Sequence, residues 1–271
     1  MKISLFSQSL FALDLPGAIA ATAEAGFAAI ELACTEPHFD LQTARKEPGQ
    51  IAAEIQQAGL LVSALSLFTS FTEPDSFDQQ VEAAAAFVRL APLFKTDVIK
   101  LTPGGPASAD SSDQHWQRLA RALERLIPVA EDSGVSLAVE THMRQLTDRL
   151  DSARRLLQMV PHKAVGLTVD FLNLAFAGEK AADVVALLRD RMYHTHVKNG
   201  YIDTDERWHF QALDRGLLDY AVVLKLLQDA HYSGYLSVEC LGPPARTAPV
   251  ETARRDLTIL ERCLTAARVK G

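Results

Sequence analysis

The sequence of 271 residues contains few cysteines, and none of them forms a metal-binding pair. The three cysteines, Cys34, Cys240 and Cys263, are widely spaced, which excludes a thiolate metal site. If two of them were bridged, the third would be left over. A reducing compartment explains this pattern more simply, so we expect a cytoplasmic protein.

The chain also lacks an excess of positive charge and any long apolar run. Its formal net charge is -7 at pH 7, which gives no electrostatic basis for binding nucleic acid or an anionic membrane surface. No segment approaches the roughly 18 consecutive apolar residues that a membrane-spanning helix needs. The N-terminal segment MKISLFSQSLFALD is too polar for a signal core. We therefore expect neither nucleic acid nor a membrane as a partner.

Eight short strand-like runs alternate with segments of helical periodicity. The runs are mostly rich in Val, Ile and Leu, as buried parallel strands are. They are predicted at residues 2–8, 28–33, 60–67, 97–102, 135–140, 164–169, 192–198 and 235–240. Eight such repeats favour a closed barrel over an open sheet, because barrels of about 250 residues form single domains. The sequence thus predicts an α/β fold, a single (β/α)8 TIM barrel domain over residues 1–271.

Four metal-ligand side chains stand near the carboxyl ends of the last four predicted strands. They are Glu140 in VSLAVE, Asp170 in VGLTVD, His196 in MYHTHV and Glu239 in YLSVE. One such acid alone is more often a helix cap or an ion-pair partner. These four residues, however, lie on the same face of their strands and at corresponding positions near the strand ends. Active sites of TIM barrels lie at this end of the strands. Three carboxylates and one imidazole predict a site for one divalent metal ion, with Mn²⁺ foremost and Mg²⁺, Co²⁺ or Zn²⁺ as alternatives.

Two residues close to these ligands are candidates for catalysis. Lys198 follows His196 by two positions, so its ammonium group is expected to face a metal-bound oxygen and stabilise an enolate; otherwise it is a solvated loop lysine. His142 follows Glu140 by two positions and is expected to orient substrate or move a proton, unless it is a structural histidine.

Other polar residues are candidates for binding substrate or supporting the ligands. Lys100, at the end of the fourth strand, can face a substrate carboxylate or phosphate, or pair with a barrel glutamate. Arg207 begins a polar-aromatic cluster with Trp208 in the loop after the seventh strand, where a lid or a solvated loop is expected. His194 is expected to support the ligand layer, and Glu31 to hold a neighbouring lysine.

These features resemble the xylose isomerase-like TIM barrel superfamily, which includes sugar phosphate isomerases and epimerases. The resemblance spans nearly the whole chain and is carried by AGFAAIEL, LAVETH, TDRLDSARRLL, GLTVDFLNL, HTHVKNG and LDRGLLDYAVVLKLLQDAHYSGYLSVEC. It implies that Glu140, Asp170, His196 and Glu239 bind one divalent metal, and that the two glutamates form the proton-transfer pair. Relatives are frequently dimers or tetramers, so the resemblance also implies a homo-oligomer.

The chain departs from the ketose 3-epimerases of this superfamily at two positions. Those enzymes carry a histidine three residues past the aspartate, where this chain has Asn173, a candidate for binding substrate in its own right. They also carry a second glutamate where this chain has Leu146. These differences weigh against a free-ketose 3-epimerase. The same superfamily contains endonuclease IV, whose three-metal site needs several more histidines than this chain supplies, so the resemblance does not imply that activity.

The sequence therefore predicts a divalent-metal-dependent sugar isomerase or epimerase acting on a small carbohydrate or oxo-acid. Proton abstraction next to a carbonyl would proceed through a metal-stabilised enediolate. The alternative is a lyase, a dehydratase or decarboxylase of an oxo-sugar or oxo-acid, because the same enolate can expel a β-hydroxyl or a carboxyl group. Lys100, Lys198 and Arg207 would suit an acidic substrate. A sugar-binding protein without activity is a third possibility, which retention of all four ligands opposes.

Overall fold

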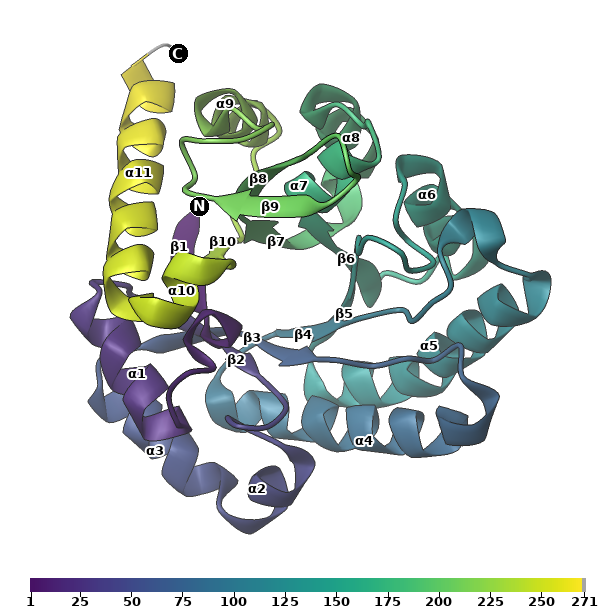
Figure 1. Ribbon diagram of the computed structural model, residues 1–271. Helices are drawn as coiled ribbons and strands as arrows, with labels where there is room; N and C mark the ends of the chain where they lie inside the picture. The colour runs from purple at the N-terminus through teal and green to yellow at the C-terminus, as the bar shows by residue number, and fades with distance from the viewer. Residues whose placement is uncertain (270–271) are drawn as a thin grey trace.

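The computed structural model describes residues 1–269 as a closed parallel barrel surrounded by helices (Figure 1). Neighbouring barrel strands follow one another in the chain, and β1 closes the barrel by pairing with β10. The barrel strands are β1 (Lys2–Phe6), β2 (Ala29–Ala33), β3 (Leu61–Leu67), β4 (Val98–Leu101), β5 (Ser136–Glu140), β6 (Val165–Asp170), β7 (Met192–Val197) and β10 (Tyr235–Val238). The predicted TIM barrel is confirmed, and each strand lies within two residues of its expected bounds.

The helices lie outside the strands and cover their apolar faces (Figure 1). They are α1 (Leu15–Glu24), α2 (Leu41–Lys46), α3 (Pro48–Gln57), α4 (Phe77–Leu90), α5 (Asp113–Ser133), α6 (Leu150–Met159), α7 (Phe171–Phe176), α8 (Ala181–Leu188), α9 (Tyr220–Asp229), α10 (Pro243–Thr247) and α11 (Pro249–Val269). Short 3₁₀ turns at Ser7–Leu10, Pro74–Ser76, Ala91–Phe94, Ser108–Asp110 and Arg189–Arg191 complete the connections.

Helix α5 illustrates how local sequence sets these elements. Its first turn is capped by Ser112, whose backbone N–H donates to Nδ1 of His115 at 3.0 Å. Leu119 and Leu123 point to the core and are fully buried. The helix ends at Gly134, whose φ of 66° is a left-handed conformation that glycine adopts without strain. The chain then enters β5, so the helix end fixes where the strand that carries Glu140 begins.

A two-stranded antiparallel sheet follows β7 and was not predicted. Strand β8 (Asn199–Ile202) pairs with β9 (Trp208–Gln211), and the hairpin crosses the view of the barrel beside α7 in Figure 1. Gly200 allows the two strands to approach, because an added Cβ would meet the backbone of His209. The polar-aromatic cluster expected in a loop therefore belongs to a hairpin.

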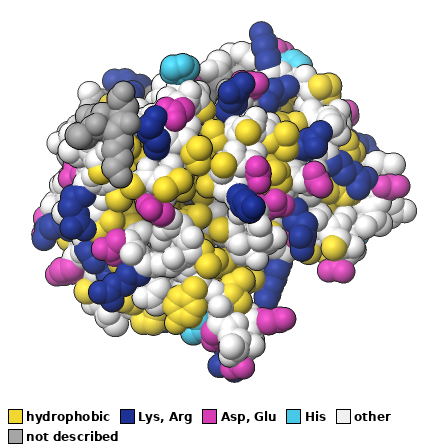
Figure 2. Space-filling view, turned by 90° about the horizontal axis from the view of Figure 1, so that it is seen from above, with side chains coloured by type: hydrophobic (Ala, Val, Ile, Leu, Met, Phe, Trp, Pro, Cys, Tyr) yellow, Lys and Arg dark blue, Asp and Glu magenta, His cyan; other side chains and the backbone are white. Residues whose placement is uncertain are grey.

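The outer surface mixes charges of both signs. Figure 2 shows that Lys and Arg side chains alternate with Asp and Glu on the face seen there, with apolar groups between them. Two of the exposed apolar side chains are Leu187 on α8 and Val222 on α9. Among the described residues, no helix is both long and apolar enough to cross a membrane.

Candidate metal centre

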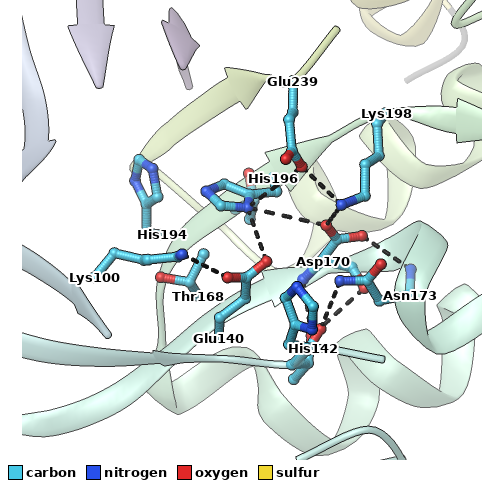
Figure 3. Close-up of polar contacts among 12 residues, drawn as sticks. Lys100, Glu140, His142, Thr168, Asp170, Asn173, His194, His196, Lys198 and Glu239 are labelled. Atoms are coloured by element: carbon cyan, nitrogen blue, oxygen red, sulfur yellow. Dashed lines mark hydrogen bonds and ion pairs between the residues drawn. The ribbon is translucent and has the colours of Figure 1, made fainter. Parts of the chain in front are cut away.

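Four strand ends bring the predicted ligands together. Glu140 and Asp170 are the last residues of β5 and β6, His196 lies near the end of β7, and Glu239 directly follows β10. In the barrel register Asp170 pairs with His196 and His196 with Ser237, so these side chains lie at similar heights. The four ligand residues are between 0% and 6% exposed. Figure 3 shows their side chains converging around the imidazole.

The Nδ1 atom of His196 faces an oxygen of each carboxylate. It lies 3.2 Å from Oε1 of Glu140 and 3.9 Å from both Oδ2 of Asp170 and Oε2 of Glu239. Ligand atoms of Glu140, Asp170 and His196 all lie within 4.8 Å of one another. This spacing suits a single ion bound by Glu140, Asp170 and His196; Glu239 stands outside that group of three, with its Oε2 3.9 Å from the imidazole.

Asp170 is oriented by the helix that follows it. Its Oδ1 accepts from the backbone N–H of Asn173 at 2.9 Å and so caps α7. Its own N–H donates to Oγ1 of Thr141 at 2.9 Å. Oδ2 therefore points into the site, where it is buried and accepts no well-directed hydrogen bond, although the Lys198 ammonium lies 2.8 Å away. Oδ2 thus faces one ammonium group and the oxygens of other buried carboxylates, so it is placed to bind a cation as well.

Two buried lysines neutralise the carboxylates. Nζ of Lys198 lies 2.8 Å from Asp170 and 2.7 Å from Glu239, whereas Nζ of Lys100 lies 2.6 Å from Oε2 of Glu140. Lys100 is only 1% exposed, so the structure places it against a barrel glutamate rather than at an open mouth. Pairing with a barrel glutamate was one of the two roles that the sequence allowed for Lys100, the other being contact with a substrate carboxylate or phosphate.

Burial and the neighbouring opposite charges act against each other on the pKa values of these groups. Burial raises the pKa of Asp170 above its usual value. Burial would also raise the pKa of Glu140, but Lys100 and His196 outweigh it and hold that pKa well below its usual value. Burial would lower the pKa of His196, yet Glu31 and Glu140 raise it to about 10.

The charge of the cluster fits a divalent cation. Four carboxylates face two ammonium groups, and an ion bound to His196 would displace its second ring proton, so with both imidazoles then neutral the net charge would be minus two. The acids are Glu31, Glu140, Asp170 and Glu239, and the cations are Lys100 and Lys198. An ion of charge plus two bound by oxygen and imidazole would balance this set, in agreement with the hard donors that Mn²⁺ and Mg²⁺ prefer.

Comparison with known proteins decides the family. The model of the xylose isomerase-like TIM barrel family matches residues 19–263. The chain belongs to this family. The resemblance predicted from the motifs is therefore confirmed.

Curated relatives of this xylose isomerase-like barrel are named as dehydratases. An inosose dehydratase of Clostridium perfringens is 26% identical over 156 residues, which is 52% of this chain and 52% of that protein. A 3-dehydroshikimate dehydratase of Bacillus anthracis is 25% identical over 201 residues, or 69% of this chain and 71% of the relative. The chain spans about half the length of the first of these relatives.

A solved L-ribulose 3-epimerase has the same fold as this xylose isomerase-like barrel. The two superpose with a TM-score of 0.80 at 19% identity, covering 99% of this chain and 96% of the epimerase. Identity at this level shows a common fold alone, so the activity must be argued from the site.

Glu31 is a site residue whose role the sequence missed. It was expected to hold a lysine, but its carboxylate instead accepts from Nε2 of His194 at 2.8 Å and from Nε2 of His196 at 2.9 Å. Ser66 donates a further hydrogen bond at 2.7 Å. His194 thus lies beneath the ligand layer as predicted, joined to it through Glu31. A glutamate at the end of the strand in AGFAAIEL was the available signal.

The structure places Arg207 away from the buried cluster. It lies between β8 and β9, its side chain is 74% exposed, and its guanidinium is 3.8 Å from Asp205. The arginine that meets the hairpin is Arg144, which lies 4.2 Å from the ring centroid of Trp208. Phe210 of the same hairpin is 5.9 Å from Nζ of Lys198 and so connects the hairpin to the site.

The remaining candidates lie beside Asp170 and Glu140. Asn173 is 1% exposed; its Nδ2 donates to the Thr141 carbonyl at 3.1 Å, while its Oδ1 has no hydrogen-bond partner. His142 is half-buried, and its Nδ1 lies 2.8 Å from the carbonyl of Met143. Leu146, at the position of the missing second glutamate, is fully buried in the core.

Proposed function

We propose that this chain is a divalent-metal-dependent lyase that removes water from an oxo-sugar or oxo-acid. The observation that carries the proposal is that both oxygens of Glu140 are engaged, one by Lys100 at 2.6 Å and one by His196 at 3.2 Å. A carboxylate held in this way is a weak base. A mechanism that needs Glu140 and Glu239 as two matched bases is therefore less favoured than one with a single separate base.

His142 is that separate base in our proposal. A carbonyl oxygen only accepts hydrogen bonds, so the contact with Met143 assigns the proton to Nδ1 and leaves the Nε2 lone pair free. His142 follows the ligand Glu140 by two residues and is half-buried, so it is both close and accessible. Nε2 takes the proton from the carbon next to the carbonyl, the carbon–carbon double bond forms as the bond to the β-hydroxyl breaks, and the His142 imidazolium returns that proton to the hydroxyl, which leaves as water.

Lys198 holds negative charge on the substrate. Burial would lower its pKa, but Asp170 and Glu239 raise that pKa above its usual value, so the side chain remains an ammonium group. Its backbone N–H donates to the hydroxyl of Tyr220 at 3.0 Å, which fixes its position. A divalent cation bound by Glu140, Asp170, His196 and Glu239 would add Lewis-acid polarisation of the substrate carbonyl.

The curated relatives support the choice of a dehydratase. One is named for inosose and the other for 3-dehydroshikimate, so an oxo-sugar or an oxo-acid is the substrate class that we infer. The absence of the epimerase residues at Asn173 and Leu146 agrees with this choice.

An isomerase or epimerase is the second candidate. In Figure 3 the carboxylates of Glu140 and Glu239 lie on opposite sides of His196, which is the arrangement that proton transfer on two faces of a substrate requires. This candidate would need Lys100 to release Glu140.

The test is to incubate the protein and Mn²⁺ with inosose, 3-dehydroshikimate and a set of ketoses in D₂O. Mass spectrometry should reveal a product lighter by one water from an oxo-sugar or oxo-acid. His142→Asn should slow formation of this product about 10²- to 10³-fold. His231→Asn, at an exposed histidine near the amino end of β10, should retain the wild-type rate. Deuterium in an isomeric product of unchanged formula would establish the second candidate instead.

A further inference from the structure

We propose that Glu31 is a positioning residue of the metal centre: it holds a proton on Nε2 of His196, so that Nδ1 is the ring nitrogen that faces the carboxylates of the proposed ligands and is available to an ion. The inference rests on the metal dependence within the proposed function, and it adds a residue from the opposite half of the barrel. It concerns the orientation and tautomer of a ligand and is independent of which reaction the site performs.

The carboxylate of Glu31 accepts three hydrogen bonds from buried donors. Oε1 accepts from His196 Nε2 at 2.9 Å and from Ser66 Oγ at 2.7 Å, and Oε2 accepts from His194 Nε2 at 2.8 Å. All four side chains are fully buried. An ionised carboxylate has no proton to donate, so each partner must supply one. Glu31 therefore fixes a proton on Nε2 of His196.

The other ring nitrogen, Nδ1, then points at the oxygens of the proposed ligands; in this structure it donates to Oε1 of Glu140, and a bound ion would take the place of that proton. Nδ1 of His196 lies 3.2 Å from Glu140 and 3.9 Å from both Asp170 and Glu239. The ring face is held by Phe6, with centroids 5.1 Å apart and planes 28° apart. With its edge held by Glu31 and its face by Phe6, the imidazole has one orientation. Such outer partners of metal-binding histidines fix both tautomer and direction.

Glu31, His194 and His196 also have the composition of a second metal site. Their nitrogen–oxygen distances of 2.8 Å and 2.9 Å are those of hydrogen bonds, and His196 would have to bind an ion through each ring nitrogen. The proposal therefore expects one metal ion per chain. Two ions per chain in metal analysis would overturn it.

The variant that tests the proposal is Glu31→Gln. Its amide keeps the shape but offers one acceptor oxygen in place of two, so it can no longer accept from both Nε2–H groups and weakens the hold on the tautomer and direction of His196. We expect Mn²⁺ affinity, measured by competition with a chelating dye, to fall about 10- to 100-fold. Glu31→Asp, which retains the charge, should recover part of the affinity. Ser66→Ala, which removes only the third donor, is the matched control and should bind Mn²⁺ almost as the wild type does.

A direct readout does not depend on the variant folding. Heteronuclear NMR of nitrogen-labelled histidine in the wild-type protein with Zn²⁺ should show His196 protonated at Nε2 and bound through Nδ1. The opposite tautomer, or a Glu31→Gln protein that binds Mn²⁺ as tightly as the wild type, would overturn the role of Glu31 alone. A wild-type protein that binds no divalent metal would overturn this inference together with the proposed function.

Discussion

In the second half of the barrel, from β5 to β10, the strand ends carry the four proposed ligands; in the first half, residues of β1, β2 and β4 contact those proposed ligands. Lys100 of β4 pairs with Glu140, and Glu31 of β2 hydrogen-bonds His196. Phe6 of β1 stacks on the same imidazole. The second half thus provides the proposed donor atoms together with Lys198, and the first half adds groups that set the charge of Glu140 and the direction of His196.

This division predicts different consequences of substitution in the two halves. Loss of a ligand should remove metal and activity together, because the donor atom itself is lost. Loss of a partner should leave the donor in place but alter its stability, its charge or its tautomer. The following predictions test this contrast.

The largest effect is expected from Asp170→Asn in the second half. The amide oxygen can still cap α7 through the Asn173 N–H, so the fold should be kept. The negative oxygen facing the site is lost, and turnover should fall on the order of 10³-fold together with metal content. Metal analysis and turnover are measured on the same sample. Asp151→Asn, at a side chain 95% exposed, is the control; an active Asp170→Asn protein with full metal would contradict the assignment.

His142→Asn should separate proton transfer from metal binding within the second half. Removal of the proposed base should lower turnover about 10²- to 10³-fold while Mn²⁺ affinity stays near the wild-type value. Turnover and dye competition measure the two quantities. Unchanged turnover would transfer the role of base to Glu239.

Lys100→Met should show that loss of a partner in the first half of the barrel lowers stability. It leaves Glu140 buried without its ammonium partner, so the free energy of unfolding in metal-free buffer should fall by about 3–5 kcal/mol. Urea unfolding measures this change. The double variant Lys100→Met/Glu140→Gln should recover much of the loss because it removes the unpaired charge; no recovery would argue against the pair.

The smallest effect is expected in the hairpin, outside both halves. Trp208 stacks on Phe176, with centroids 6.2 Å apart and planes 7° apart, and carries Arg144 on its ring. Trp208→Ala should lose about 1–2 kcal/mol of stability. It should raise KM several-fold with little change in kcat, since Phe210 of the same hairpin borders the site. Tyr201→Ala, at an exposed position of β8, is the control. A KM for Trp208→Ala equal to that of the wild type and of the control would contradict a role of the hairpin in substrate binding.

The two halves also differed in what the sequence could predict. The proposed ligands could be picked out because residues of metal-binding type recur on the inward face at the ends of short apolar strands, which is a local pattern. The contact of Glu31 with His196 joins residues 165 positions apart. It depends on which inward side chains meet across the closed barrel, and no local pattern contains that information.

The hairpin was missed for a different reason. Its turn, DTDER, contains no glycine and no Asn-Gly or Asp-Gly pair, which are the usual signals of a tight hairpin. Arg207 was therefore placed in a loop, either a lid or a solvated segment, as a candidate for binding substrate. Trp208 and Phe210 alternate in β9 and approach Phe176, a contact that only the paired strands create.

The pairing of β10 with both β1 and β7 has a consequence for the order in which the site forms during synthesis. Glu140, Asp170 and His196 leave the ribosome before Glu239, and Glu239 reaches them only when β10 inserts between the first strand and the seventh. The complete metal centre therefore cannot exist before the ring of strands is shut. An ion captured by all four ligands would bind only the closed barrel and would stabilise that closure.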